Sequence, residues 1–193
     1  MSLGIPVPSL AAAVDARALS SLQQVRSQLK RPRIDFLNAS IDPQDIHDAL
    51  MVGKICAYAQ GFSVLAAAKS TLWPHLEMSD AARVWRQGCI IRSKLLENVR
   101  GAYLRTPQLP SLLLDQGIAE PLFATVDRLR KVVVVAQSEC LPVPALASAL
   151  TYLDSISAPR LWADVVQAQR DFFGQHGFKR LDKEGIQHGP WGA

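Results

Sequence analysis

A long apolar segment that begins at Asp42 constrains the fold of this 193-residue chain more than any other feature. Asp42 is a good helix cap, Pro43 suits a first helical turn, and Asp45 faces the positive end of the helix dipole. Apolar residues then continue at helical spacing to about Thr71, separated by glycine and alanine and by few charges. A helix that is apolar on nearly all faces is buried on nearly all faces. We therefore predict a central helix over 43–71 and a helical domain around it.

The remaining segments also have the periodicity of helices. Apolar residues three and four positions apart predict them, with a connector at 30–41 and a short apolar turn at 112–114. The predicted helices span 9–29, 79–88 with Ser79 as its cap, 90–105, 118–137, 145–156 and 161–173. Val132–Val135 also has the composition of a buried strand, but nothing nearby offers a strand partner. We predict an all-α helical bundle.

A ten-residue motif occurs twice, at 5–14 and again 136 residues later at 141–150, with six of the ten positions identical. Each copy has a Pro-Val-Pro helix start followed by an alanine-rich helix. The spacing is far longer than the 20 to 50 residues of a solenoid repeat, so it indicates a duplicated helical bundle. The second copy follows a predicted helix and the first does not, so we expect the chain to begin inside a larger domain.

Composition narrows the class of protein. The chain is 49% hydrophobic, which predicts a globular domain. No run approaches about 18 consecutive apolar residues and no signal peptide is present, so we predict no membrane partner and a cytoplasmic location. Cys56, Cys89 and Cys140 stand far apart without a C-x-x-C pair, which predicts reduced thiols. The net charge of +4 is compatible with an anionic ligand, but basic and acidic residues alternate, and we predict no nucleic-acid partner.

Motifs for catalysis and cofactor binding are missing from the sequence. It has no G-x-G-x-x-G after a strand, no phosphate-loop motif and no H-E-x-x-H. The four histidines lie in different segments without a pair four residues apart: His47, His75, His176 and His188. We predict no catalytic, cofactor-binding or metal-binding residue in this chain, and a surface role for all these histidines except His176.

Three residues are candidates for binding an anion. Arg170 lies near the end of the helix predicted over 161–173, and His176 follows after the expected terminator Gly174. An arginine fork donates paired hydrogen bonds to a phosphate or carboxylate, and a nearby histidine adds another donor. Arg17 lies on a helix otherwise lined by small residues. The alternatives are a surface arginine and a capping histidine, and for Arg17 a solvated or ion-paired side chain.

Four motifs follow one another along the chain. They are Lys-Ile-Cys-Ala-Tyr-Ala-Gln-Gly-Phe at 54–62, Trp-Arg-Gln-Gly-Cys-Ile-Ile-Arg-Ser at 85–93, Gln-Ala-Gln-Arg-Asp-Phe-Phe-Gly-Gln-His at 167–176, and Lys-Arg-Leu-Asp-Lys-Glu-Gly at 179–185. In this order they resemble motifs of the 6-phosphogluconate dehydrogenase family. The resemblance covers essentially the whole chain after Leu3, but only the last part of a family member. It implies that residues 1–193 are the C-terminal part of the family's duplicated helical domain, with a tail from about 175 to 193.

The resemblance also implies an activity. The family oxidatively decarboxylates 6-phosphogluconate to ribulose 5-phosphate with NADP, in the pentose phosphate pathway. Its Rossmann domain, its lysine base and glutamate acid, and its K-G-T-G-x-W stretch have no counterpart in this sequence. We therefore expect the parent enzyme to use NADP, and this chain alone to bind no cofactor and to be inactive.

The motif matches assign roles to the three candidates. Arg17 matches the arginine that contacts the substrate phosphate in the family, and Arg170 and His176 match contacts to 6-phosphogluconate from the neighbouring subunit. A homodimer is implied, in which one subunit's C-terminal tail completes the other's active site. Gly177 replaces the family's usual threonine, Gln175 its alanine, and 187–191 is a loose version of its H-T-x-W ending.

Two other functions stay open at this point. The first is a stand-alone, non-catalytic helical assembly module derived from the same family. The second is an anion-binding or nucleic-acid-binding helical protein that uses the basic excess. We also expect exposed apolar surface around the helix predicted over 9–29, and with it self-association.

Overall fold

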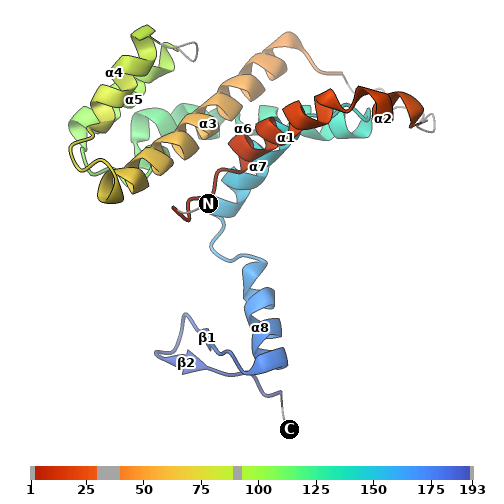
Figure 1. Ribbon diagram of the computed structural model, residues 1–193, viewed down its shortest axis with the longest axis vertical. Helices are drawn as coiled ribbons and strands as arrows, with labels where there is room; N and C mark the ends of the chain where they lie inside the picture. Colours follow the sequence, from red (N-terminus) through yellow and green to blue (C-terminus); the bar gives the residue numbers. More distant parts are fainter. Residues whose placement is uncertain (1–2, 30–39, 89–92, 192–193) are drawn as a thin grey trace. The chain divides into compact units, whose positions relative to one another are not determined.

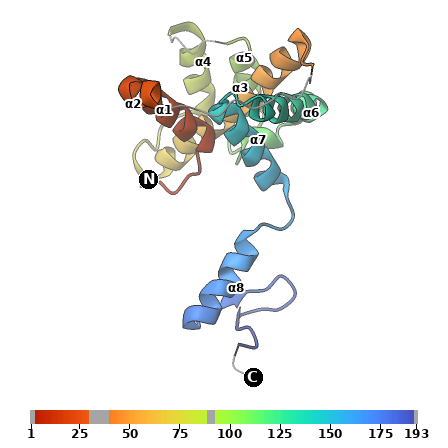
Figure 2. The same ribbon diagram turned by 90° about the vertical axis from the view of Figure 1, so that its right-hand side faces the viewer.

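The computed structural model describes residues 3–29, 40–88 and 93–191. It divides into two compact units, Met1–Leu153 and Asp154–Ala193 (Figures 1 and 2). The described residues form eight α-helices, one short 3-10 helix and one two-stranded hairpin, and the all-α prediction is confirmed. The sequence predicts one domain with a tail from about residue 175. In the structure the helix predicted over 161–173 belongs to the same unit as this tail.

The first unit contains most of the helices. They are α1 (Pro8–Ser21), α2 (Gln23–Gln28), α3 (Pro43–Thr71), α4 (Met78–Gly88), α5 (Leu95–Arg105), η1 (Leu112–Leu114), α6 (Gln116–Ser138) and α7 (Pro144–Ser157), whose last turn reaches the second unit. The second unit adds α8 (Ala163–Gly174), β1 (Phe178–Lys179) and β2 (Ile186–Gln187). Val132–Val135 is helical, within α6.

Several helix limits differ from the prediction. The helix predicted over 9–29 is broken at Leu22, next to Ser20 and Ser21, whose hydroxyls donate to the carbonyls of Arg17 and Ala18. Ser79 lies inside the first turn of α4 and does not cap it. The helix predicted from residue 90 begins only at Leu95, and 89–92 lie outside the described residues.

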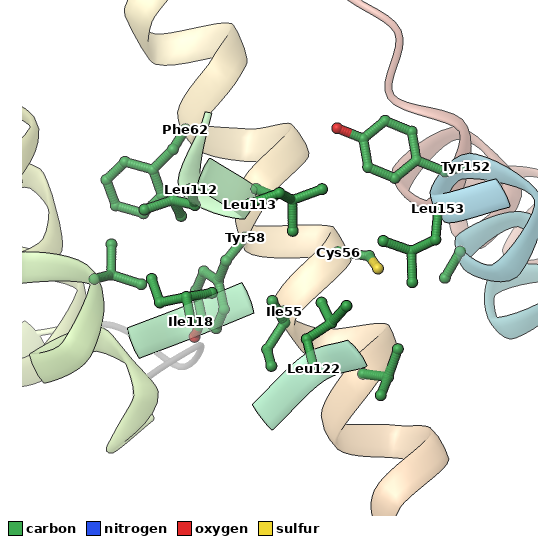
Figure 3. Close-up of a cluster of buried hydrophobic side chains, with 14 of the residues drawn as sticks. Ile55, Cys56, Tyr58, Phe62, Leu112, Leu113, Ile118, Leu122, Tyr152 and Leu153 are labelled. Carbon is green, nitrogen blue, oxygen red and sulfur yellow. The ribbon is translucent and has the colours of Figure 1, made fainter. Parts of the chain in front are cut away.

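Helix α3 begins with the predicted cap. The Asp42 side chain accepts from the Asp45 backbone N–H at 2.8 Å, and the Asp45 side chain accepts from the Asp42 backbone N–H at 3.3 Å, which makes a reciprocal capping box. The helix then packs most extensively against α6. Figure 3 shows its buried side chains among those of η1, α6 and α7, including Cys56, Phe62 and Leu122.

Burial of α3 is less complete than predicted. Ile46, Leu50 and Met51 are exposed on its first half, although the helix is central to the hydrophobic core. Among the described residues, α3 alone has the length and apolar composition of a membrane-crossing helix, and 44% of its most apolar window is buried inside the protein. Its packing in the unit is that of a core helix.

The repeated motif is a repeated structure. Helices α1 and α7 are both 14 residues long. The first residue of α7 lies 136 positions after that of α1, and the last residues are separated by the same offset. In each copy the second residue of Pro-Val-Pro accepts the first helical hydrogen bond at 2.9 Å, Ala11 to Val7 and Ala147 to Val143. Both helices also contact α3. Ser9 of α1 is hydrogen-bonded to Gln60 of α3, and Leu146 of α7 lies against Gly53 of α3. The duplication therefore places two equivalent helices on one central helix.

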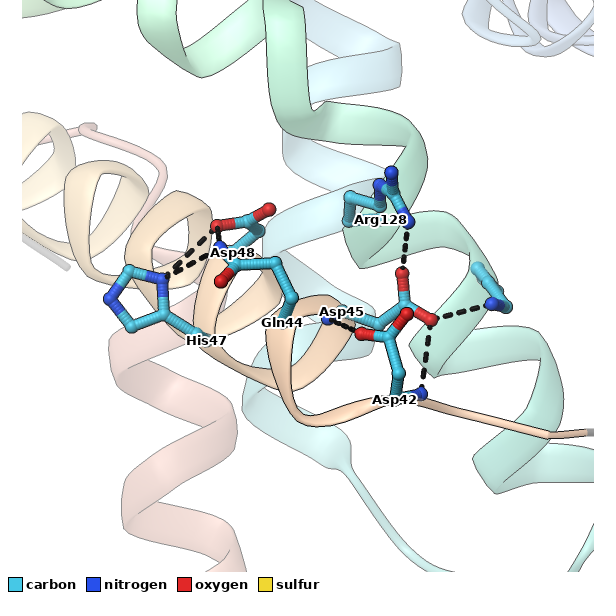
Figure 4. A network of polar contacts seen from close by, with 7 residues as sticks. Asp42, Gln44, Asp45, His47, Asp48 and Arg128 are labelled. Carbon is cyan, nitrogen blue, oxygen red and sulfur yellow. Dashed lines mark hydrogen bonds and ion pairs between the residues drawn. The ribbon is translucent and has the colours of Figure 1, made fainter.

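A buried carboxylate joins α3 to α6. Asp45 is fully buried, and its two oxygens accept from Arg128 Nη1 at 2.6 Å and Lys131 Nζ at 2.5 Å (Figure 4). The hydrogen bonds from Lys131 and then Arg128 lower the pKa of Asp45 from 3.8 to about 2, although burial opposes them. The ionised form of Asp45 is therefore part of the α3 and α6 packing.

We expect Asp45→Asn to flatten the acid limb of the stability profile. The folded pKa lies below the ordinary value, so the contribution of Asp45 is complete above about pH 4 and is lost as the pH falls through about 2. Urea unfolding at a series of pH values should show wild type losing more stability than Asp45→Asn over this window. Asp80→Asn on the exposed side of α4 is the control, and equal slopes for wild type and Asp45→Asn would contradict the prediction.

Candidate functional site

Arg17 lies on α1, whose start is anchored on α3. The Ser9 backbone N–H donates to Gln60 Oε1 at 3.0 Å, and Gln60 Nε2 donates to Ser9 Oγ at 2.9 Å. Both residues are buried, so this pair of bonds holds the first turn of α1 in place. Arg17 follows two turns later, about 12 Å along the helix axis. The sequence motif contained Gln60, but nothing local to it indicated that its partner would be Ser9.

The guanidinium of Arg17 is available to a ligand. Its side chain is exposed, and within the described part of the chain it makes no hydrogen bond or ion pair. Arg17 is therefore not ion-paired with any described residue. The two interpretations that remain are a solvated side chain and an anion-binding one.

Arg170 lies on α8, and His176 follows two residues after the end of that helix. Arg170 is exposed and its Nη1 donates to Gln167 at 3.0 Å. A side chain at Gly174 would begin 2.8 Å from His176 Nε2, so the imidazole of His176 occupies the space over that glycine. Residues 170 and 174 are one turn apart on the same helix face. The ring of His176 therefore lies over the helix face that carries Arg170, while the Arg170 guanidinium points to Gln167; the contact of either residue with a substrate stays a prediction.

The end of α8 differs from the predicted glycine terminator. Gly174 is the last helical residue, and the left-handed conformation belongs to Gln175, with φ 50° and ψ 36°. The Gln175 N–H donates to the Asp171 carbonyl at 2.8 Å. The ring of His176 lies where a side chain at 174 would begin, a contact that the local pattern did not show.

The last residues of the described chain gather around Asp171. Asp171 is fully buried, and its Oδ1 accepts from the Gly177 N–H at 2.8 Å and His188 Nδ1 at 2.6 Å. Its Oδ2 accepts from the Gly189 N–H at 2.8 Å and Trp191 Nε1 at 2.6 Å. Burial alone would raise the pKa of this carboxyl, but the four donors outweigh burial and hold the pKa well below its usual range. We call these five residues the Asp171 clasp.

The tail after His176 is ordered as a hairpin that the sequence did not predict. β1 and β2 pair antiparallel, with Phe178 opposite Gln187 and Lys179 opposite Ile186. Gly177 has φ +70°, and a side chain there would begin 2.2 Å from Ile186 Cγ2. Glycine in place of the family's usual threonine therefore fits this turn, both for its backbone and for its space.

Large apolar side chains are exposed in both units. The segment of α1 and α2 exposes Leu10, Val14, Leu19, Leu22 and Val25, so apolar surface is exposed around 9–29 as expected. In the second unit the exposed apolar residues include Trp162, Val165, Phe172, Phe173 and Leu181. Grouped exposed apolar residues mark surfaces that bind other protein surfaces.

Other titratable groups offer no second site in the described residues. No group of three histidine, cysteine or acidic side chains there is placed to hold a metal. Burial raises the pKa of the Cys56 thiol to about 12, so this thiol is not a nucleophile at neutral pH. Cys89 lies outside the described residues. His188 is exposed as predicted but belongs to the Asp171 clasp.

A groove of about 1040 Å³ lies in the second unit, between the segment before α8 and the hairpin. Two of its three basic residues are paired with acids, Arg160 with Asp164 and Arg180 with Asp182. Arg170 and His176 do not line it. Its neutralised charges do not favour an anion site, so the candidate residues remain Arg170 and His176 in the second unit and, separately, Arg17 in the first.

Comparisons with known proteins agree on one family. Residues 1–191 match the family model described as "6-phosphogluconate dehydrogenase, C-terminal domain". A decarboxylating 6-phosphogluconate dehydrogenase of Staphylococcus aureus is 38% identical over 99% of this chain, and an NADP(+)-dependent one of Bacillus subtilis is 36% identical over 99%. The chain spans 42% of the length of each of these relatives.

A solved structure has the same fold. The Plasmodium falciparum 6-phosphogluconate dehydrogenase, determined as apoenzyme, with NADP+ and with 6-phosphogluconate, matches 97% of this chain with a TM-score of 0.86 and 34% identity. The match covers 42% of that enzyme. The sequence motifs, the fold and these matches lead to the same conclusion. The chain belongs to the 6-phosphogluconate dehydrogenase family and corresponds to its C-terminal domain.

Proposed function

We propose that this chain is the C-terminal, substrate-binding and dimerisation part of an NADP-dependent 6-phosphogluconate dehydrogenase. The enzyme oxidatively decarboxylates 6-phosphogluconate to ribulose 5-phosphate, in the cytoplasm and in the pentose phosphate pathway. The observation that carries the proposal is the place of the His176 ring, which lies over the α8 face that carries Arg170. The chain also matches such enzymes over nearly its whole length.

The chemistry of the three residues suits this substrate. 6-Phosphogluconate carries a phosphate and a carboxylate, and an arginine fork binds either group through two parallel, charge-assisted hydrogen bonds. In the proposal Arg17 binds the phosphate, and Arg170 and His176 of the neighbouring subunit add donors. Contacts to a phosphate remote from the reacting carbons supply binding energy that orients the sugar acid.

The exposed apolar residues support the dimer. Exposure of Trp162, Phe172 and Phe173 to water is unfavourable for a second unit without a partner. Packing of α8 and the hairpin on a second subunit covers such residues and carries Arg170 and His176 to the partner's site. This arrangement makes each active site dependent on two chains.

The nucleotide is assigned to the other part of the enzyme. The described residues contain no strand, glycine-rich turn and helix in the order that binds a dinucleotide, so they do not fit NADP. We assign no residue of this chain to the cofactor, and propose NADP for the parent enzyme because the Bacillus subtilis relative is named as NADP(+)-dependent.

The test uses the chain alone and a full-length enzyme that carries it. We expect NADPH formation from 6-phosphogluconate only by the full-length enzyme. In that enzyme Arg17→Ala should lower kcat/KM by roughly 10- to 150-fold, since a hydrogen bond to a charged group contributes about 1.5–3 kcal/mol. Arg26→Ala, on the exposed α2, is the matched control and should change kcat/KM less than about twofold. NADPH formation by the purified chain alone, or wild-type kinetics of Arg17→Ala, would refute the proposal.

The exposed apolar residues of α1 and α2 also favour a second candidate function, that of a stand-alone assembly module without catalysis. The gene sequence upstream of the Gly4 codon separates the two. A reading frame that continues into a glycine-rich dinucleotide fingerprint supports the enzyme. A stop codon and a ribosome-binding signal just upstream support the module.

A further inference from the structure

Asp171 holds both neighbours of His176, one through its backbone carbonyl and one through its carboxylate. The Asp171 carbonyl accepts from the Gln175 N–H, and its carboxylate accepts from the Gly177 N–H, each at 2.8 Å. Gln175 and Gly177 both have positive φ, so the chain reverses sharply on either side of His176. One residue of α8 therefore fixes the backbone before and after the histidine, whose ring lies over Gly174.

The same carboxylate also holds the end of the described chain. His188, Gly189 and Trp191 donate to it, and the Trp191 ring packs edge-on against Phe172 with centroids 5.7 Å apart. The hairpin between Gly177 and Gln187 is thus closed at its base by two sets of bonds to one side chain. Loss of this carboxylate removes the four bonds together.

We propose that Asp171 is a positioning residue for substrate binding, which closes the C-terminal tail onto α8 and so holds His176 on the face of Arg170. The proposal rests on the proposed function, in which His176 contacts the substrate. Asp171 itself is fully buried beneath its donors and does not touch the ligand. Its effect on the reaction passes through the placement of His176.

The chemistry of the clasp requires a carboxylate. Each oxygen of Asp171 accepts two N–H groups, and all four partners are donors. Asparagine has nearly the same shape but only one acceptor oxygen, so its amide N–H groups would face two of the donors. Asp171→Asn therefore opens half of the clasp while it changes the volume of the side chain very little.

The experiment is a double-mutant cycle in a full-length enzyme that carries this chain. We expect Asp171→Asn to raise KM for 6-phosphogluconate about tenfold or more, with kcat and KM for NADP within about twofold of wild type, because only substrate binding is lost. His176→Ala should raise the same KM by at least as much. The double variant should match His176→Ala within about twofold, since Asp171 acts only through that residue.

The controls separate positioning from loss of folding. Asp164→Asn removes an exposed carboxylate from the first turn of α8 and should leave KM unchanged. Trp191→Phe keeps an aromatic ring at this position and removes one donor to the clasp. It should raise KM about threefold on the wild-type background and not at all on His176→Ala. This second cycle decides the question if melting by circular dichroism shows that Asp171→Asn is unfolded.

The outcomes distinguish the inference from the proposed function. If His176→Ala leaves KM for 6-phosphogluconate unchanged, the substrate role of His176 is wrong and the positioning role falls with it. If His176→Ala raises KM but Asp171→Asn does not, only the positioning role is overturned. Effects of Asp171→Asn and His176→Ala that multiply in the double variant would also overturn it.

Discussion

Equal amounts of two nearly inactive variants of the full-length enzyme, Arg17→Ala and Arg170→Ala, should recover about a quarter of the wild-type activity after their subunits exchange. In the proposed dimer each active site takes Arg17 from one subunit and Arg170 from the other. A mixed dimer then has one site with both arginines intact and one site with neither. Each variant by itself lacks one arginine in every site and should keep at most about a tenth of wild-type kcat/KM.

The expected recovery follows from counting sites. Random exchange makes about half of the dimers mixed, and each mixed dimer carries one intact site out of two. The measurement is NADPH formation after reversible dissociation of the mixture, or after co-expression with two affinity tags and purification of the mixed species. The tagged, purified mixed dimer should reach about half of the wild-type activity.

The same experiment has a clear negative form. If Arg17 and Arg170 of one subunit served the same site, no exchange would restore a complete pair, and the mixture would stay at the level of the single variants. The matched control mixes Arg17→Ala with Arg17→Lys, which never assembles an intact pair. Recovery in that control, or none in the test mixture, would contradict the shared site.

Phe62→Ala should cause the largest loss of stability. Phe62 is fully buried on α3 and joins two other helices, edge-on to Trp85 of α4 at 5.1 Å and stacked on Tyr103 of α5 at 5.3 Å. Replacing a buried phenylalanine by alanine leaves a cavity and lowers the free energy of unfolding by about 3–5 kcal/mol. Each lost ring pair contributes about 0.5–1.5 kcal/mol beyond area burial. Such a loss is a large fraction of the ordinary stability of a domain, about 5–15 kcal/mol.

The measurement for Phe62 is chemical unfolding followed by far-ultraviolet circular dichroism. Phe123→Ala on α6 is the matched control, because Phe123 is half exposed and its truncation should lower stability by about 1 kcal/mol or less. Equal losses in the two variants would contradict the central place of Phe62. Trp85→Ala combined with Phe62→Ala should lose less than the sum, since both remove the same ring contact.

Much of the fold was predictable because its signals are local. The start of α3 followed from Asp42, Pro43 and Asp45, which lie within one turn, and the structure shows the predicted Asp42 cap as one half of a reciprocal capping box. The repeat at an offset of 136 residues predicted two equivalent helix starts, and α1 and α7 match to the residue. The break at Leu22 was missed, because the apolar periodicity continues through this position and does not report where the backbone leaves the helix.

The candidate site was predictable only in part. Arg17, Arg170 and His176 came from chemical type and from motifs, and the reversal that places His176 beside the face of Arg170 was not visible in them. Gly174 illustrates the reason. The sequence pattern suggested a terminator, whereas the backbone at 174 is helical and the missing side chain makes room for an imidazole.

The sequence by itself determined the helices, the duplicated design and the chemical identity of the three candidate residues, because capping, periodicity and side-chain type act over a few neighbouring positions. Only the tertiary structure decided what holds those residues. Gln60 meets Ser9 across 51 positions and Asp171 meets Trp191 across 20, and such pairs form only after the chain has packed. Buried polar groups take whichever partners the packing brings within reach, so their bonds cannot be read from spacing.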